Sequence, residues 1–212
     1  MRESVREKPM PTLHVVGDSI SQHYGPYLQQ YLGGLLAYSR KEGMPGDPNE
    51  PNGSNGGDSS LVLRYLWACK ERGLRWDYLL LNCGLHDIRT DPTSGVKQVM
   101  PETYQRNLRE IIPLACSLAA HVVWVRTSPV VDAIHNARSQ AFHRHAVDVD
   151  SYNAIADAIM REDGVPAIDL FSFTRALGDD LYMDHVHYRD GVRHLQGAFI
   201  AGYLASRCAR HS

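Results

Sequence analysis

Short apolar runs recur along this chain and predict the strands of a sheet. The runs at residues 12–16, 77–83 and 121–125 are short, strongly apolar and followed by Gly or polar residues, as is typical of buried parallel strands. Residues 35–38 and 165–170 are weaker strand candidates, because each is shorter or borders a Gly-rich turn. The pattern therefore predicts five strands.

Stretches in which apolar residues return every three or four positions lie between these runs and predict helices. They cover residues 59–72, 101–119, 150–162 and 192–207, and helix-like sequence also follows Ser19. Strands that alternate with helices predict an α/β fold with a parallel sheet and right-handed crossovers. Without repeats or a linker in the sequence, we expect a single domain over residues 1–212, with residues 1–11 as a flexible N-terminal segment.

Residues 43–58 form the one low-complexity stretch, GMPGDPNEPNGSNGGD. Its Gly, Pro and Asn content excludes a helix or a central strand and predicts a solvated surface loop. The end of the stretch precedes a predicted helix, with Asp58 or Ser59 as a plausible N-cap. Free backbone N–H groups gather at such a helix start, so this part of the loop can hold an anion or a developing oxyanion.

Composition narrows the function classes. The 212 residues carry 22 Lys and Arg against 24 Asp and Glu, a net charge of −2, which gives no basic footprint for nucleic acid or an anionic membrane. No apolar stretch reaches the roughly 20 residues that span a bilayer. The first eleven residues lack the apolar centre of a secretory signal, so we expect a cytoplasmic protein. The sequence does not indicate an oligomeric state.

The four cysteines and eleven histidines raise the question of a metal site. The cysteine spacings of 14, 33 and 92 match no zinc motif, and in an intracellular chain they indicate reduced thiols. The pairs His143 with His145 and His185 with His187 lack a further ligand at helical spacing. We therefore expect no metal and no organic cofactor.

Polar residues follow several of the predicted strands, and ligands of open parallel sheets bind at the carboxyl ends of the strands. The first strand leads to Ser19, the third to residues 83–87 and the fourth to residues 126–128. A serine nucleophile needs a base, and the base needs a carboxylate that fixes its tautomer. Ser19, His187 and Asp184 could supply these parts, since a carboxylate three residues before a histidine can reach its Nδ1.

Three short motifs, taken together, resemble the SGNH (GDSL-type) hydrolases. They are GDSI at residues 17–20, NGGDSS at residues 55–60 and DHVH at residues 184–187, with Gly191 and the closing helix after the last. The resemblance implies a three-layer α/β/α sandwich with a five-stranded parallel sheet, the flavodoxin-like SGNH hydrolase fold. It also implies that Ser19 is the nucleophile, Asp184 and His187 are the acid and base, and no cofactor takes part.

By the same resemblance, the oxyanion hole comprises the backbone N–H groups of Ser19 and Gly57 and the side chain of residue 86. The family usually has Gly-x-Asn-Asp here, whereas this chain has His86 in Gly84-Leu-His-Asp. A neutral imidazole can donate one N–H, so His86 could replace the amide. Alternatively, His86 is a general acid or base, and a weaker likeness points to carbohydrate-active esterases.

The resemblance implies a serine esterase. The short connection after Ser19 and the lack of a large lid insertion indicate an open, shallow site, which favours short acyl groups, such as acetyl, on a carbohydrate or another small soluble substrate. Asp87 and Arg126 are further candidates for substrate binding; Arg126 could hold an acidic or sugar substrate, or pair with a nearby Asp. Three alternatives stay open: an acyltransferase that uses an alcohol acceptor, another carbohydrate-active enzyme with His86 as acid or base, and a non-catalytic binding module. His185 could replace His187 as the base if the Asp-x-x-His spacing is misread.

Overall fold

The computed structural model describes residues 9–42 and 53–211, which form a parallel sheet between two layers of helices. The strands pair in the order β2-β1-β3-β4-β5, all in parallel, and are β1 (Thr12–Val16), β2 (Ala37–Arg40), β3 (Trp76–Leu81), β4 (Ala119–Val125) and β5 (Ala167–Ile168). The helices are α1 (Ser19–Tyr31), α2 (Ser59–Glu71), α3 (Pro101–Leu118), α4 (Asp132–Arg138), α5 (Ala146–Glu162), α6 (Leu170–Arg175) and α7 (Asp190–His211). The predicted five-stranded parallel sheet is confirmed.

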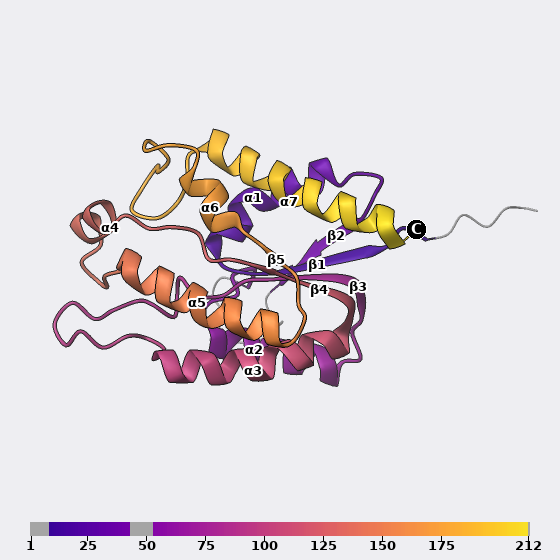
Figure 1. Cartoon of the computed structure of the whole chain (residues 1–212), viewed down its shortest axis with the longest axis horizontal. Helices are drawn as coiled ribbons and strands as arrows, with labels where there is room; N and C mark the ends of the chain where they lie inside the picture. The colour runs from indigo at the N-terminus through magenta and orange to yellow at the C-terminus, as the bar shows by residue number, and fades with distance from the viewer. Residues whose placement is uncertain (1–8, 43–52, 212) are drawn as a thin grey trace, which may run out of the picture.

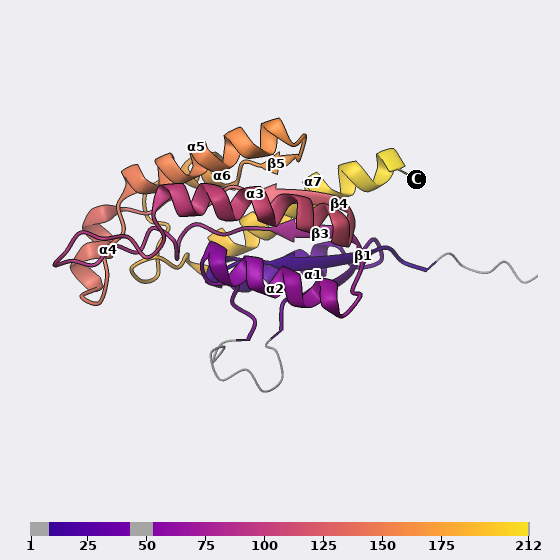
Figure 2. The same ribbon diagram turned by 90° about the horizontal axis from the view of Figure 1, so that it is seen from below.

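The helices pack on both faces of the sheet, so the architecture is the predicted α/β/α sandwich. Helices α1, α6 and α7 lie over one face, and α2, α3 and α5 lie side by side over the other (Figures 1 and 2). The central strands are buried between these layers: Leu13, Leu79 and Trp124 have no exposed surface. Burial on both faces explains why these strands read as continuous apolar runs in the sequence.

The first, third and fourth strands lie close to their predicted positions, but other elements differ. Strand β2 starts two residues later than predicted, where the Ala37 N–H bonds to the Pro11 carbonyl. Strand β5 keeps two residues, because the Asp169 side chain accepts the Ser172 N–H and starts α6. Helices α4 and α6 were not predicted, since their seven and six residues are too few to reveal a helical spacing of apolar positions.

Two expectations fall wholly or partly outside the described residues. The N-terminal segment 1–11 is described only from residue 9, and the loop 43–58 only from residue 53. Within the described part, residues 53–58 lead into α2, and Asp58 is its N-cap, with the side chain accepting the Leu61 N–H at 3.0 Å. No helix in the described ranges has the length and apolar character needed to cross a membrane.

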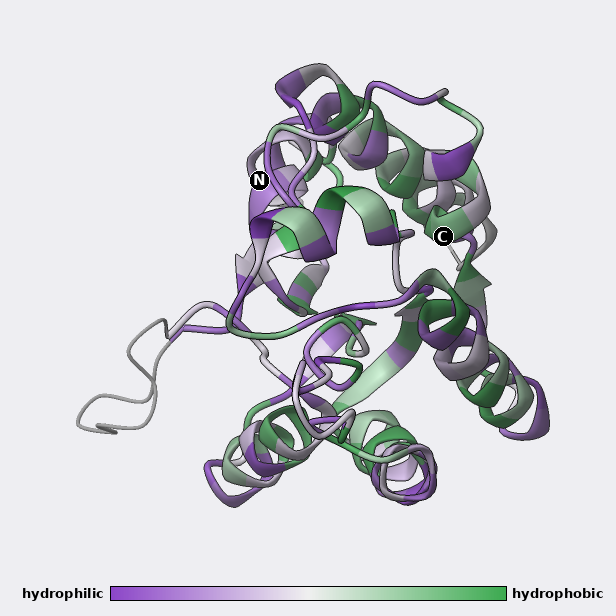
Figure 3. Ribbon diagram, turned by 90° about the vertical axis from the view of Figure 1, so that its left-hand side faces the viewer, coloured by the Kyte–Doolittle hydropathy of each residue, from purple (hydrophilic) through white to green (hydrophobic). Residues whose placement is uncertain are grey.

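The loops that follow the strands gather at one edge of the sheet, which faces the viewer in Figure 3. Close backbone approach at this edge depends on Gly84, which follows β3. Its φ is +149°, and a Cβ at this position would overlap Thr127 Oγ1. The Thr127 hydroxyl in turn donates to the Cys83 carbonyl at 3.1 Å, so the loops after β3 and β4 are joined at this point.

We predict that Gly84→Ala destabilises the fold by roughly 2–5 kcal/mol, because the backbone strain and the steric overlap with Thr127 add. Denaturant unfolding measures the free energy. Gly164 has φ +66° and open space where a Cβ would stand, so Gly164→Ala introduces the backbone strain without a steric overlap. This substitution should cost about 1–2 kcal/mol. Gly202→Ala, inside α7 with open space, should be neutral or stabilise by up to ~1 kcal/mol. Equal costs at Gly84 and Gly164 would contradict the role assigned to the Thr127 contact.

Candidate active site

Ser19 is the first residue of α1 and follows closely on the end of β1 at Val16. The preceding residue caps the helix, since Asp18 Oδ1 accepts the Ile20 N–H at 2.9 Å. The Gly17 carbonyl accepts the Gly56 N–H at 2.8 Å, so the loop before α2 lies against this turn. The strand, the cap and the loop together fix Ser19 at the carboxyl edge of the sheet, as the sequence predicts.

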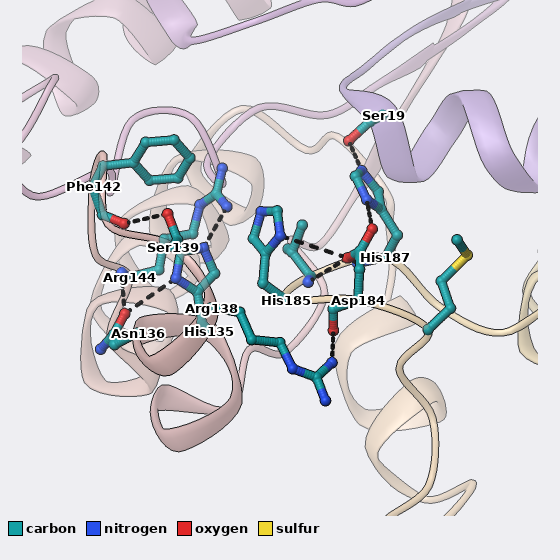
Figure 4. A network of polar contacts seen from close by, with 12 residues as sticks. Ser19, His135, Asn136, Arg138, Ser139, Phe142, Arg144, Asp184, His185 and His187 are labelled. Atoms are coloured by element: carbon teal, nitrogen blue, oxygen red, sulfur yellow. Dashed lines mark hydrogen bonds and ion pairs between the residues drawn. The ribbon is translucent and has the colours of Figure 1, made fainter.

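Ser19, His187 and Asp184 form a chain of hydrogen bonds (Figure 4). Ser19 Oγ lies 2.8 Å from His187 Nε2, and His187 Nδ1 lies 2.7 Å from Asp184 Oδ2. Because the carboxylate can only accept from Nδ1–H, Nε2 is the nitrogen that accepts the Ser19 hydroxyl proton. The hydroxyl, imidazole and carboxylate are thus arranged for proton transfer from serine to histidine.

Asp184 is held as a carboxylate by the turn in which it lies. Oδ1 accepts the backbone N–H groups of Val186 at 2.8 Å and His187 at 2.7 Å. Burial alone would raise the pKa of Asp184, but these two N–H groups and the His187 imidazole outweigh it and lower the pKa to about 2. The carboxylate is therefore charged at any pH near neutrality.

The turn itself is anchored to the loop after β4. Tyr182 and Tyr188 flank the turn, and both hydroxyls donate to the Pro129 carbonyl, at 2.8 and 2.7 Å. The Met183 N–H also bonds to the His187 carbonyl at 2.8 Å. Since Pro129 lies in the loop after β4, these contacts tie the turn to the end of a central strand.

A cavity of about 560 Å³ opens next to Ser19 and His187. Side chains from several loops and from α1 line it, and most of them are polar or aromatic: Gln22, His23, Ser54, Asn55, His86, Arg89, Phe142, Arg144 and His185. The cavity therefore offers a polar site beside the serine hydroxyl.

His86, the oxyanion candidate of the sequence analysis, lines this cavity. Burial lowers its pKa to about 3, with the positive charges of Arg89 and Arg144 and the nearby His187 acting in the same direction. The ring is therefore neutral at physiological pH and carries one N–H. Within the described residues, no hydrogen bond occupies the His86 ring.

Gly57 is placed differently from the expectation. Its φ of +70° and the Leu61 side chain, which a Cβ at this position would overlap, require glycine there. However, its N–H donates to Asn55 Oδ1 at 2.8 Å, and Asn55 rather than Gly57 borders the cavity. The Gly57 N–H can reach an oxyanion only if the Asn55 side chain releases it.

The two substrate-binding candidates lie outside the cavity lining. Asp87 is fully buried, and its Oδ1 accepts the Ser59 N–H at 2.9 Å, so it supports the start of α2. Burial raises the pKa of Asp87 to about 7. Arg126 binds two carboxylates, Asp169 at 2.6 Å and Asp157 at 3.1 Å, which matches the ion-pair alternative for this residue.

The sequence also missed residues that the fold brings to the cavity. Three of them are Arg89, Phe142 and Arg144, which lie in loops whose position the sequence pattern does not predict. In the sequence, Arg144 is notable only as the residue between two histidines. His23 follows Ser19 by one helical turn, and its ring lies 4.6 Å from that of His187. Helical spacing from Ser19 could have identified His23. In residues 9–42 and 53–211, no three His, Cys, Asp or Glu side chains meet in a metal-binding group.

Known proteins resemble this chain in sequence and in fold. The model of the GDSL-like lipase/acylhydrolase family matches residues 15–192. A search of curated protein sequences finds no match. Among solved structures, the chain resembles a lipase/acylhydrolase from Enterococcus faecalis, with TM-score 0.71, 16% identity and coverage of 93% of this chain and 97% of the other.

Two further solved structures are similar in fold. An acetyl xylan esterase from Geobacillus stearothermophilus gives TM-score 0.65 and 15% identity, covering 93% of this chain and 94% of the other. A carbohydrate acetylesterase from Sinorhizobium meliloti gives TM-score 0.63 and 14% identity, covering 92% and 99%. At these identities the likeness establishes the fold.

Behind the cavity wall, His135 supports Arg144 and must stay neutral to do so. Arg144 Nη1 donates to His135 Nε2 at 2.8 Å, so the ring proton is on Nδ1 and faces Asn136 Oδ1 at 3.1 Å. Burial, followed by the charge of Arg144, lowers the pKa of His135 to about 4. In the unfolded chain the pKa returns to about 6.5.

We predict that the contribution of His135 to stability is lost as the pH falls from about 6.5 to 4, because in this window the unfolded chain binds a proton at His135 and the folded chain does not. One such histidine contributes a slope of up to about 1.4 kcal/mol per pH unit. His135→Gln keeps an acceptor for Arg144 and removes the titration, so its unfolding free energy should depend less steeply on pH in this window. His194→Gln, on the surface beside Tyr31, is the control. An unchanged slope in His135→Gln would contradict the assignment.

Proposed function

This chain belongs to the GDSL-like lipase/acylhydrolase family and is a hydrolase that acts on esters, and we propose that Ser19, His187 and Asp184 are its catalytic triad. The observation that carries the proposal is the unbroken hydrogen-bond chain from Ser19 Oγ through His187 to Asp184. It lies at the edge of the sheet where this architecture binds ligands and opens onto a polar cavity.

In the proposed reaction, Ser19 Oγ attacks the ester carbonyl while His187 Nε2 takes the hydroxyl proton. Asp184 stabilises the imidazolium that forms, which its low pKa allows. Collapse of the tetrahedral intermediate passes this proton to the leaving alcohol and leaves an acyl group on Ser19. Water, activated by the same His187, then releases the acid and restores the serine.

The negative oxygen of the intermediate needs donors that are already in place. We assign this role to the backbone N–H of Ser19 and to the neutral ring of His86, with the Gly57 N–H joining them once Asn55 moves. The absence of any hydrogen bond to the His86 ring among described residues supports the assignment, because the ring N–H is then available. The alternative role of acid or base has less support, since a pKa of about 3 makes His86 a weak base.

The proposed substrate is a short-chain ester, such as an acetyl ester, of a carbohydrate or another small polar alcohol. The polar lining of the cavity supports a polar substrate over a long lipid chain. The fold likeness to an acetyl xylan esterase and a carbohydrate acetylesterase is in keeping with this class.

We predict that Ser19→Ala lowers hydrolysis of para-nitrophenyl acetate by about 10³-fold or more, because the nucleophile is lost. Absorbance of the released nitrophenol measures the rate, and circular dichroism verifies the fold. A fluorophosphonate should label wild-type protein at Ser19 and leave Ser19→Ala unlabelled. Ser151→Ala, on the exposed side of α5, is the control and should keep both activity and labelling. Activity near wild type in Ser19→Ala would eliminate this mechanism.

For His86, we predict that Ala lowers kcat by about 10²–10³-fold, because one oxyanion donor is lost. Asn should restore most of that loss, since its amide donates a hydrogen bond and cannot act as a base. Steady-state kinetics of the three proteins on one acetyl ester measures this. If Asn is as inactive as Ala, the imidazole acts through its basicity instead; equal activity in all three would remove His86 from the reaction.

A further inference from the structure

Two arginines in the wall of the Ser19 cavity have no acidic partner. Arg89 lies in the turn after β3, and Arg144 lies between α4 and α5. In the described part of the chain, neither guanidinium is within ion-pair distance of a carboxylate, and no Asp or Glu borders the cavity. Arg126, by contrast, binds two aspartates.

The backbone holds the two arginines close to one another. Thr90 and His143, their neighbours in sequence, form an antiparallel bridge with N–H to carbonyl distances of 2.9 and 2.8 Å. The guanidinium carbons of Arg89 and Arg144 lie 4.5 and 4.9 Å from the centre of the Phe142 ring. Figure 4 shows Phe142 and Arg144 at one end of the network and His187 at the other, with His185 between them. Two like charges are thus fixed against one aromatic ring.

Their surroundings leave donor groups unused. Arg144 is 3% exposed; Nε donates to the Leu85 carbonyl and Nη1 to His135, while Nη2 has no partner in the described residues. The Arg89 side chain makes no hydrogen bond to the described residues, and its Nε is buried. A buried charge without hydrogen bonds and a counter-ion is unfavourable, so both groups can gain from an anion in the cavity.

Both arginines keep their charge, and the protein supplies no anion at contact distance within the described ranges. Burial lowers the pKa of Arg89, and burial together with the charge of Arg89 lowers the pKa of Arg144 to about 9, still above neutrality. The carboxylates that attract Arg89 from a distance, Asp18 and Asp58, are used as helix caps. The Phe142 ring stabilises the cations in part but offers no acceptor for their N–H groups.

We propose that the ester cleaved at Ser19 carries a carboxylate group, which Arg89 and Arg144 bind while the scissile carbonyl lies at Ser19. The inference rests on the proposed function and adds a substrate class to it: esters of acidic sugars, hydroxy acids or dicarboxylic acids. Guanidinium forks match the planar carboxylate, and both arginines line the same cavity as the nucleophile. The carboxylate can belong to the alcohol or to the acyl part, and the two are separated by experiment.

The test compares two pairs of esters that differ in one charge. In the first pair the carboxylate is on the alcohol part: para-acetoxybenzoate is compared with its methyl ester. In the second pair the carboxylate is on the acyl part: mono-para-nitrophenyl adipate is compared with methyl para-nitrophenyl adipate. The measured quantity is the anionic-to-neutral ratio of kcat/KM, normalised by spontaneous hydrolysis. At least one pair should give a ratio of roughly 10–100, the range for a hydrogen bond to a charged group, and the ratio should fall as salt is added.

Arg89→Gln should bring that ratio to near one, and Arg89→Lys should retain part of it because it keeps the charge. Arg89 is the residue to replace, since Arg144 also bonds to Leu85 and His135 and its loss could disturb the fold. Arg109→Gln, which removes an exposed arginine of α3 paired with Glu162, is the matched control and should leave the ratio unchanged.

A ratio near one for both pairs in wild-type protein, with Ser19 labelled by fluorophosphonate, would overturn this inference and leave the proposed function in place. A ratio that falls equally in Arg89→Gln and Arg109→Gln would also overturn it. A protein that cleaves neither member of either pair and leaves Ser19 unlabelled would overturn the proposed function and this inference together.

Discussion

The contact between Ser19 Oγ and His187 Nε2 joins residues 168 positions apart in the chain, and the candidate site depends on it. A hydroxyl and an imidazole exchange a proton only at hydrogen-bond distance, so both backbones must be fixed independently. On one side, β1 and the Asp18 cap fix Ser19. On the other, the Asp184 turn is bound through Tyr182 and Tyr188 to Pro129 after β4. Because β1 and β4 are parallel, the two segments that hold Ser19 and the Asp184 turn lie at the same edge of the sheet.

Much of this arrangement could be predicted from sequence, because the informative features are local. The buried strands β1, β3 and β4 are continuous apolar runs, and Gly-Asp-Ser and Asp-x-x-His mark the turns that bear Ser19, Asp184 and His187. Parallel topology then places the ends of the strands together. The short helices α4 and α6 could not be predicted, and β5 was predicted with the wrong bounds, since these bounds are set by tertiary contacts and by local caps such as Asp169.

The parts of the site that escaped prediction are those that depend on the packed surroundings of each group. Nothing local distinguishes Arg126, which binds two aspartates, from Arg89, which binds none of the described carboxylates; the difference is the presence of Asp157 and Asp169. Likewise, the sequence around Gly57 indicates a turn but cannot show that Asn55 occupies the Gly57 N–H. Residue types predict which chemistry is available, and only the packing shows which groups remain unbound.

The charges around the cavity also explain why one histidine among several is suited to accept a proton. Burial comes first in lowering the pKa of His23, His86 and His135, and neighbouring arginines act in the same direction. His185 Nδ1 is 3.8 Å from Asp184 Oδ1, whereas His187 Nδ1 is 2.7 Å from Oδ2 and directly hydrogen-bonded. A positive charge on His187 is therefore compensated locally, while a positive charge on His86 or His135 would face the guanidinium groups of nearby arginines. The same positive wall favours negative charge that develops at Ser19 on an attacked carbonyl, so the features that keep His86 neutral also favour the oxyanion it is proposed to bind.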